Sequence, residues 1–337
     1  MKALALFSGG LDSMLAIKLI SSQGIEVKAL HIDIGFGAVN LENLDKREEE
    51  LRARARLAGA DFAVVDIKNS YLQEVLFSPK YGYGKAYNPC IDCHGYMFKT
   101  AFSMLESEKA SFLITGEVLG QRPMSQRAQA LRSVSKLSGD DEGLILRPMS
   151  ALCMSETKPE RELWVKRELL EGITGRSRKR QMQMAEDFGW SKDDYESPAG
   201  GCLLTLQGFA SKIKDHVAHA PLSVAGAALL KLGRHLRLPE GAKMIISRSE
   251  LENKALLRVM SEHENTGMSF LECDLVGALC LLDNEACKAD IELASSLALA
   301  YQRLDPSKTS FSLAFRGQKI EAKAASKEEA ARFFVLH

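Results

Sequence analysis

A glycine turn near the start of the chain contains the residues best suited to holding a phosphate. The string Ser8-Gly9-Gly10-Leu11-Asp12-Ser13 follows the apolar run 2–7 and leads into a helix expected from Asp12 to Ser22. Backbone N–H groups at a helix start are unpaired, and with the helix dipole they favour phosphate or pyrophosphate. Glycine permits close backbone approach, Ser8 and Ser13 offer hydroxyls, and Asp12 is placed to hold Mg²⁺. The turn therefore predicts a nucleotide phosphate site.

A second candidate site is a pair of thiols at a loop-to-helix junction. The string Asn88-Pro89-Cys90-Ile91-Asp92-Cys93-His94 places Cys90 and Cys93 three positions apart, which suits one metal centre. A helix start is expected to lower the pKa of both thiols. From these residues alone, half of a structural zinc site, a redox dithiol and ligands of an iron–sulfur cluster all stay open.

The other cysteines differ in their surroundings. Cys202 follows two glycines in the loop 195–202, where we expect an exposed, functional thiol. Cys153 and Cys280 have apolar neighbours on both sides and are predicted to be core residues. Cys273 and Cys287 receive no role. The total of seven is odd, which favours metal ligands, reactive thiols or core residues over disulfides in a reducing compartment.

Composition limits the kinds of partner. The 337 residues are enough for two domains, and 44 basic residues balance 44 acidic ones. A chain with no net charge has no global attraction for nucleic acid, so RNA binding would need local patches. We expect a cytoplasmic protein with neither a signal peptide nor a membrane span.

The first half of the chain alternates strand and helix patterns, which predicts an α/β fold with a parallel sheet covered on both faces. The expected strands are 2–7, 27–33, 62–67, 111–115 and 144–147, and the expected helices are 12–22, 41–57 and 98–108. Residues 78–93 read as a long loop that leads into the thiol pair. Ligands of such sheets bind beyond the carboxyl ends of the strands, where the glycine turn falls.

The second half has a different texture. After about residue 221 we expect strands at 243–248, 273–282 and 310–316, with helices at 250–262, 288–303 and 327–336. This pattern predicts a smaller C-terminal α+β domain. The expected division is 1–170 for the nucleotide domain, 171–225 for a basic connecting segment with the third cysteine loop, and 226–337 for the small domain.

A compact basic run, Arg176-Ser177-Arg178-Lys179-Arg180, is the candidate for contacts with RNA phosphates. Its residues Arg176, Arg178, Lys179 and Arg180 have no acidic neighbours in sequence, although most such runs are only solvated surface. The helical stretch 122–136 offers further basic residues. Neutralising the run is expected to weaken RNA binding and its salt dependence.

The motifs together resemble known families. The string 8–13 is similar to the PP-loop of the ATP-pyrophosphatase superfamily, which cleaves ATP between the α and β phosphates, and it matches neither the Walker nor the Gly-x-Gly-x-x-Gly pattern. The string 116–121 is similar to the tRNA 4-thiouridine synthetase family. The Asn-Pro-Cys loop and Gly201-Cys202 are similar to the 2-thiouridylase family. These resemblances cover about residues 1–205, while residues 232–253 weakly resemble the RNA-binding module of NFACT proteins, for which a dimerisation or stabilising role stays open.

The resemblance implies a fold, a reaction and a set of site residues. The fold would be a PP-loop (adenine nucleotide alpha hydrolase-like) domain, and the chain would be an ATP-dependent tRNA sulfurtransferase that adenylates a nucleobase oxygen and replaces it with sulfur. ATP would be held by the glycine turn with Mg²⁺, and also by His31, Gly116 and Gln121. The catalytic residues would be Asp12, Cys93 and Cys202.

The resemblance leaves the sulfur chemistry open. Cys90, Cys93 and Cys202 would hold a [4Fe–4S] cluster, or Cys93 and Cys202 would form a persulfide pair without metal. The partners implied are tRNA and a sulfur donor, either free sulfide or a persulfide carrier protein, and a homodimer stays open. The alternatives are another PP-loop ligase that acts on a small molecule, and a non-catalytic nucleotide-responsive RNA-binding protein.

Overall fold

The computed structural model describes residues 1–38, 40–42, 46–196 and 201–335. Its contacts divide the chain into two compact units, Met1–Gly37 with Asn43–Cys202, and Ala38–Glu42 with Leu203–His337. The expected connecting segment is therefore shared, with residues 171–202 in the first unit and 203–225 in the second. Whether these units fold as separate domains stays a prediction.

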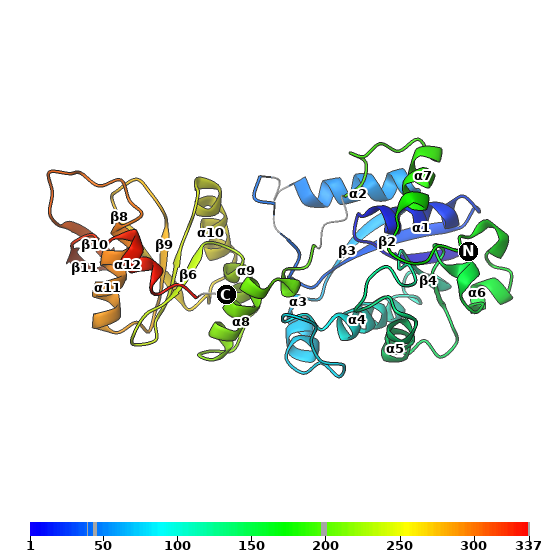
Figure 1. Cartoon of the computed structure of the whole chain (residues 1–337), viewed down its shortest axis with the longest axis horizontal. Coiled ribbons are helices and arrows are strands. Elements are labelled where there is room, and N and C mark those ends of the chain that lie inside the picture. The colour runs from blue at the N-terminus through cyan, green and yellow to red at the C-terminus, as the bar shows by residue number, and fades with distance from the viewer. Residues whose placement is uncertain (39, 43–45, 197–200, 336–337) are drawn as a thin grey trace. The chain divides into compact units, whose positions relative to one another are not determined.

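A parallel sheet forms the centre of the first unit (Figure 1). Its strand order is β3-β2-β1-β4-β5, and every neighbouring pair is parallel. The strands are β1 (Lys2–Leu6), β2 (Glu26–Asp33), β3 (Asp61–Asp66), β4 (Phe112–Thr115) and β5 (Ile145–Leu146). The order reverses between β1 and β4, and such a switch point is where ligands of open α/β sheets bind. The predicted α/β class is confirmed.

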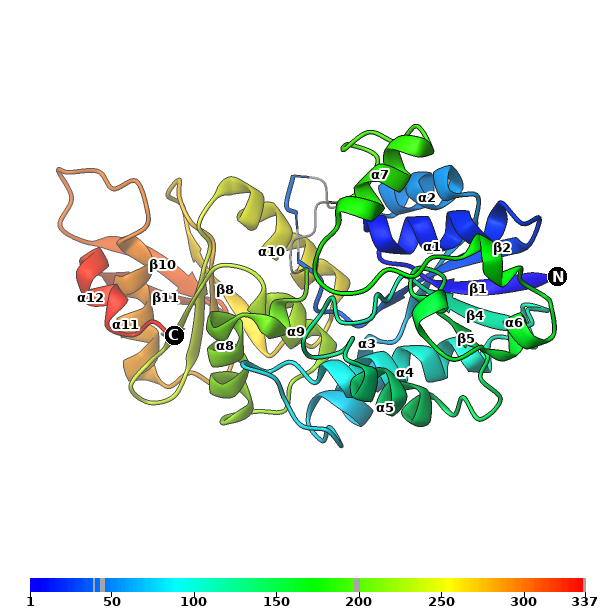
Figure 2. The same ribbon diagram turned by 45° about the vertical axis from the view of Figure 1, so that its right-hand side comes forward.

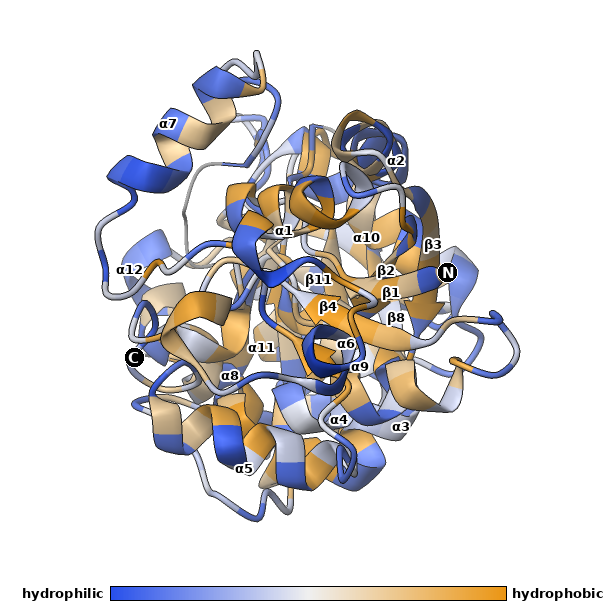
Figure 3. Ribbon diagram, turned by 90° about the vertical axis from the view of Figure 1, so that its right-hand side faces the viewer, coloured by the Kyte–Doolittle hydropathy of each residue, from blue (hydrophilic) through white to orange (hydrophobic). Residues whose placement is uncertain are grey.

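Helices cover both faces of this sheet (Figures 1 and 2). One core contains Met14, Leu51 and Met184, and the other contains Phe98 and Val134. The first face is covered by α1 (Leu11–Ser21), α2 (Arg47–Ala58) and α7 (Lys179–Asp187), and the second by α4 (Cys90–Ser103) and α5 (Ala128–Ser138). Short turns complete the unit: α3 (Lys68–Tyr71), a π-helical turn at Leu72–Leu76 and α6 (Lys158–Arg161). Figure 3 colours the region of β4 as hydrophobic and much of α7 as hydrophilic.

Several expected boundaries moved. The helix expected over 98–108 begins earlier, at Cys90, so the thiol pair opens α4 rather than preceding it. Residues 43–45 of the helix expected over 41–57 lie outside the described residues, and α2 begins at Arg47. Residues 197–200 of the loop 195–202 also lie outside them.

The second unit contains an antiparallel sheet of six strands in the order β11-β10-β8-β9-β7-β6. The strands are β6 (Arg234–Arg237), β7 (Lys243–Ile246), β8 (Met268–Cys273), β9 (Cys280–Asp283), β10 (Phe311–Phe315) and β11 (Gln318–Ala322). The helices are α8 (Gln207–Val217), α9 (Val224–Leu230), α10 (Glu250–Glu262), α11 (Lys288–Leu299) and α12 (Lys327–Ala331). The predicted α+β architecture is confirmed.

Two predictions about the second half of the chain, one strand and one helix, were wrong. The strand expected over 273–282 is two strands joined by a turn, because the chain reverses where Gly277 approaches the Tyr301 carbonyl. The helix expected over 327–336 ends at Ala331, and residue 336 lies outside the described residues.

Cys153 is exposed rather than buried, because its apolar neighbours form a single 3₁₀ turn, Ala151–Cys153, at the surface. Cys280 is buried in β9 as expected. Within the described residues, no helix combines the length and apolarity that crossing a bilayer requires.

Candidate active site

The glycine turn joins β1 to α1. Gly10 is the N-cap of α1, with φ −84° and ψ 158°, and no side chain caps this helix start. The first N–H groups of a helix need a partner from outside the helix. The turn therefore offers an uncapped, positively polarised helix start, as a phosphate site requires.

The two glycines of the turn are required for different reasons. Gly9 has φ +79°, and a Cβ there would lie 2.5 Å from Cδ2 of Leu51 on α2. Gly10 has an ordinary negative φ, and among the described residues a Cβ there would meet only Oγ of Ser8, at 3.5 Å. Folding therefore demands glycine at position 9, whereas no described residue other than Ser8 limits the space beside Gly10.

The hydroxyls of the turn are engaged with the turn itself. Oγ of Ser13 donates to the Gly10 carbonyl over 2.8 Å, and Ser8 accepts from the Gly10 N–H over 3.4 Å. The two hydroxyl oxygens lie 3.5 Å apart. These contacts fix the shape of the turn.

Asp12 links three distant parts of the sequence. Its Oδ2 accepts from Nε2 of Gln121 over 2.7 Å and from Nη2 of Arg178 over 2.9 Å. Its Oδ1 is buried and has no hydrogen-bond partner among the described residues. A buried carboxylate oxygen without a donor fits the ligand set of Mg²⁺, which prefers carboxylate and phosphate oxygens.

Gly116 brings the end of β4 against the glycine turn. A Cβ at Gly116 would lie 2.5 Å from both the carbonyl carbon of Asp12 and the backbone nitrogen of Ser13. Only glycine lets the end of β4 approach the backbone of the glycine turn this closely. Gly116 and Gln121 thus lie beside the turn, although ATP contacts for them stay a prediction.

His31 is turned towards the backbone of β1. Its Nδ1 donates to the Phe7 carbonyl over 3.1 Å, and burial lowers its pKa, so the ring is neutral at pH 7. An ATP contact for His31 stays a prediction.

Two arginines of α2 were missed by the sequence reasoning. Arg47 and Arg54 both donate to the carboxylate of Glu196, the latter over 2.9 Å. The Glu196 N–H donates to the Gly9 carbonyl over 3.3 Å, which places this group beside the glycine turn. Their separation of seven residues on a helix, which puts them on one face, was the signal available in the sequence.

The three candidate thiols converge on one buried tyrosine. Cys90 and Cys93 open α4, and Cys202 forms an antiparallel bridge with Gly37 beyond β2. Burial raises the pKa of Tyr71, and the nearby thiols of Cys93, Cys202 and Cys90 raise it further. The Tyr71 side chain is fully buried, and its hydroxyl lies beside Cys93 without a hydrogen bond of ordinary geometry within the described residues.

The expected lowering of the thiol pKa is wrong for Cys93. Although the residue is half-buried, its thiol lies deep in the protein, and burial raises its pKa to about 12 against the lowering effect of Tyr71. The nearby thiols of Cys202 and Cys90 and the Asp92 carboxylate raise it further. Desolvation therefore outweighs the helix start, and Cys93 is a neutral thiol at pH 7 unless an electrophile or metal replaces the proton.

The thiols fit an iron–sulfur cluster by their chemistry, since such clusters are held by cysteine thiolates. Among the described residues, no three His, Cys, Asp or Glu side chains have the geometry of a single-ion site. Cys90 also accepts a hydrogen bond from Nδ2 of Asn88 over 3.1 Å.

A buried ionic group connects the thiols to the sheet. Glu117, which is 4% exposed, accepts from Nε of Arg147 over 3.0 Å and lies 2.8 Å from Nδ1 of His94. Burial opposes its ionisation, but Arg147 and His94 outweigh burial and hold the pKa of Glu117 below its usual value. His94 follows Cys93 and Glu117 follows Gly116, so this group ties the start of α4 to the loop beside the glycine turn.

The basic run divides into paired and unpaired charges. Arg178 pairs with Asp12, and Arg180 pairs with Glu171 over 2.5 Å. Arg176 and Lys179 are exposed and have no ion pair among the described residues. An RNA contact for any of the four stays a prediction.

Comparison with known families gives two matches. Residues 1–157 match the model of thiamine biosynthesis protein (ThiI), and residues 233–334 match that of the NFACT protein RNA binding domain. The resemblances to PP-loop tRNA thiolation enzymes and to the NFACT module are confirmed.

Curated relatives share the first half of the chain. A tRNA-specific 2-thiouridylase MnmA from Petrotoga mobilis is 29% identical over 130 residues, which is 35% of this chain and 35% of that protein. A "Probable tRNA sulfurtransferase" from Thermococcus kodakarensis is 30% identical over 155 residues, 46% of this chain and 38% of that protein. The chain thus spans little more than a third of the length of these relatives.

A solved structure with a similar part is a 4-thiouridine synthetase in complex with RNA and ATP. It has a TM-score of 0.42 and 17% identity, and the match covers 61% of this chain and 45% of that one.

Proposed function

We propose that this chain, whose residues 1–157 match the ThiI family model, is an ATP-dependent tRNA sulfurtransferase. The observation that carries the proposal is the meeting, in one unit, of an uncapped glycine turn and three thiols gathered around Tyr71. The turn suits ATP, and the thiols suit sulfur transfer. The RNA-binding family model that matches residues 233–334 supports RNA as the substrate.

ATP would lie with its phosphates against the glycine turn. The free space at Gly10 admits a phosphate oxygen, and the unpartnered Oδ1 of Asp12 would hold Mg²⁺. Gln121 and Arg178 orient the Asp12 carboxylate through its other oxygen. Arg47 and Arg54 add positive charge beside the departing pyrophosphate.

The first step activates an oxygen of the base. Oxide is a poor leaving group, so a uracil or cytosine oxygen attacks the α-phosphorus of ATP, and the bond to pyrophosphate breaks. The N–H groups of the turn would stabilise the departing pyrophosphate, and Asp12 would hold the Mg²⁺ that shares this charge. In the second step a sulfur nucleophile forms a C–S bond, and AMP leaves with the oxygen.

Two routes for sulfur delivery are compatible with the thiols. In the first, one thiol of the pair Cys93 and Cys202 would carry a persulfide whose outer sulfur attacks the activated carbon. The other thiol would then break the S–S bond and leave a Cys93–Cys202 disulfide, which an external thiol reductant would reduce. Alternatively, all three would hold a [4Fe–4S] cluster, which when bound supplies an iron without a protein ligand to receive hydrosulfide. We favour the cluster, because three thiols gather here and a persulfide pair needs only two. The donor would be sulfide or a persulfide carrier protein, in the cytoplasm.

The function is tested by nucleoside mass spectrometry of tRNA. A deletion strain is expected to lack one thionucleoside, which the wild-type gene restores and an Asp12→Asn gene does not. Asn keeps the size of the side chain but removes the charge that Mg²⁺ needs. An intact thionucleoside profile in the deletion strain would contradict the proposal and favour a small-molecule PP-loop ligase or a non-catalytic RNA-binding protein.

The cluster is tested by anaerobic purification with quantification of iron and sulfide. We expect iron and sulfide in the wild-type protein and their loss in Cys90→Ala, with Cys153→Ala, an exposed thiol of the same unit, as the matched control. If the wild-type protein is fully active without iron, the cluster is contradicted and the persulfide route is favoured. The tRNA activity is measured on the same samples, so the two proposals fail separately.

A further inference from the structure

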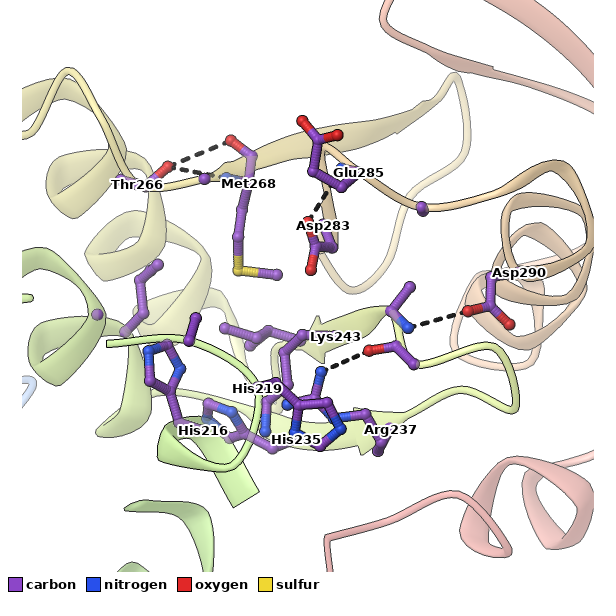
Figure 4. A pocket seen from close by; sticks show the side chains of 18 of the residues that line it. His216, His219, His235, Arg237, Lys243, Thr266, Met268, Asp283, Glu285 and Asp290 are labelled. Atoms are coloured by element: carbon purple, nitrogen blue, oxygen red, sulfur yellow. Dashed lines mark hydrogen bonds between the residues drawn. The ribbon is translucent and has the colours of Figure 1, made fainter. Parts of the chain in front are cut away.

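The second unit contains a cavity that the proposed reaction does not use. Its volume is about 420 Å³, and all its lining residues lie between His216 and Asp290 (Figure 4). The size is that of a small organic ligand.

His235 lines this cavity and has an unused acceptor. The side chain comes from β6 and is 3% exposed, and its Nε2 donates to the Leu232 carbonyl over 2.8 Å. Burial and the nearby Lys212 and Lys243 lower its pKa well below the usual value, so the ring is neutral. A neutral ring with its hydrogen on Nε2 has a lone pair on Nδ1, and this atom is buried without a partner among the described residues. A buried acceptor without a donor is costly, so a ligand donor would be stabilised there.

The cations of the lining are already paired. Arg237 donates to Asp215 over 2.9 and 3.0 Å, and Lys243 forms an ion pair with the same carboxylate. Asp290 is occupied by the N–H groups of Glu240 and Ala242. Each of these two lining cations therefore already has a carboxylate partner, Asp215, which the two share.

The opposite wall offers an apolar surface and further acceptors. Figure 4 shows His216, His219 and His235 on one side of the cavity and Met268, Asp283 and Glu285 on the other. Burial lowers the pKa of His216, so this ring is also neutral at pH 7. Imidazole rings and a thioether are favourable neighbours for a planar heterocycle, and carboxylates accept from its N–H groups.

We propose that this cavity binds one unstacked nucleobase of an RNA strand, with an N–H of the base donating to Nδ1 of His235. The inference rests on the proposed function for the presence of RNA. Positive charge for the phosphates stands next to the cavity, because exposed Arg316 donates through Nη1 to the carbonyl of Asn284, between Asp283 and Glu285. The base would enter the cavity while the backbone stays in solvent at Arg316.

The test is a titration of the full chain with a labelled single-stranded RNA, followed by fluorescence anisotropy. Ala286→Trp fills the cavity, and we expect it to weaken binding about tenfold, the effect of losing one stacked base. Ala289→Trp is the matched control, since Ala289 is exposed at the start of α11 and does not line the cavity. His235→Gln keeps an N–H donor for the Leu232 carbonyl but moves the acceptor away from the position of Nδ1, and it is expected to weaken binding similarly.

Competing nucleoside monophosphates distinguish the two sources of a base. Displacement of RNA by a monophosphate only at much higher concentration supports the proposal. Binding of a monophosphate that RNA does not displace would overturn it in favour of a free nucleotide, and equal RNA affinity of wild type, Ala286→Trp and His235→Gln would overturn it outright. The two proposals can fail separately. If RNA binding depends on the cavity but the deletion strain keeps all its thionucleosides, the proposed function is contradicted and the cavity proposal is not.

Discussion

Cys93 illustrates how burial decides the chemistry of a single group. A helix start favours the thiolate, yet desolvation is larger and raises the pKa to about 12. Buried groups give up their charged form unless a partner replaces the water. In this site the partner would be a metal or an incoming sulfur atom, so Cys93 would be activated by what binds it.

Alkylation tests the protonation of Cys93. We expect mass-mapped labelling of the metal-free protein by iodoacetamide at pH 8 to be at least about tenfold slower at Cys93 than at exposed Cys287, because the thiolate is the nucleophile. Equal labelling of the two thiols would contradict the raised pKa.

The same shift affects stability in alkali. The pKa of the Cys93 thiol is raised in the folded state. The protonated thiol therefore contributes its full share to folding stability below the ordinary pKa of 9.0, and this contribution is lost as the pH rises towards about 12. Wild-type unfolding free energy should therefore fall more steeply over this range than that of Cys93→Ala, as measured by denaturant titration.

At the scale of elements, the β1–α1 connection separates what folding needs from what binding needs. Gly9 is held by its positive φ and by Leu51 on α2, whereas Gly10 has room for a side chain. The same connection receives Gly116 from the end of β4, which places three segments of the chain around one turn.

The two glycines give opposite expected outcomes on substitution to alanine. Gly9→Ala should lower the free energy of unfolding by about 1–3 kcal/mol, through strain at positive φ and the contact with Leu51. Gly10→Ala should keep the thermal unfolding temperature and weaken ATP binding, measured by calorimetry, since its methyl group occupies the phosphate space. Loss of stability in Gly10→Ala with unchanged ATP affinity would contradict the site.

At the scale of the molecule, the charge available for the proposed RNA contacts depends on which basic groups the fold leaves unpaired. The chain has no net charge, and the first unit uses Arg178 and Arg180 for ion pairs of its own. Arg176 and Lys179 are the members of the run available to phosphates.

Salt dependence tests this division. The double variant Arg176→Gln, Lys179→Gln should reduce the slope of log affinity for tRNA against log salt by about 2, one for each lost phosphate contact. Arg180→Gln is the control and should change the slope little, because its charge is matched by Glu171. A slope that is unchanged in the double variant would remove the run from the RNA interface.

The sequence by itself determined the features that depend on neighbouring residues. The glycine turn, the parallel strands and the thiol pair at a helix start are local patterns, and the structure has each of them. Local patterns set backbone conformation and the direction of side chains, so they predict elements well.

The tertiary structure decided which distant side chains meet. Arg178 and Asp12, which are 166 positions apart, form one ion pair, so a residue expected to contact RNA lies beside the glycine turn. Glu117 is buried between His94 and Arg147, which are 23 and 30 positions away in the sequence. The exposure of Cys153 and the raised pKa of the Cys93 thiol were both mispredicted for one reason. Burial depends on packing across the whole unit and not on the residues next in sequence.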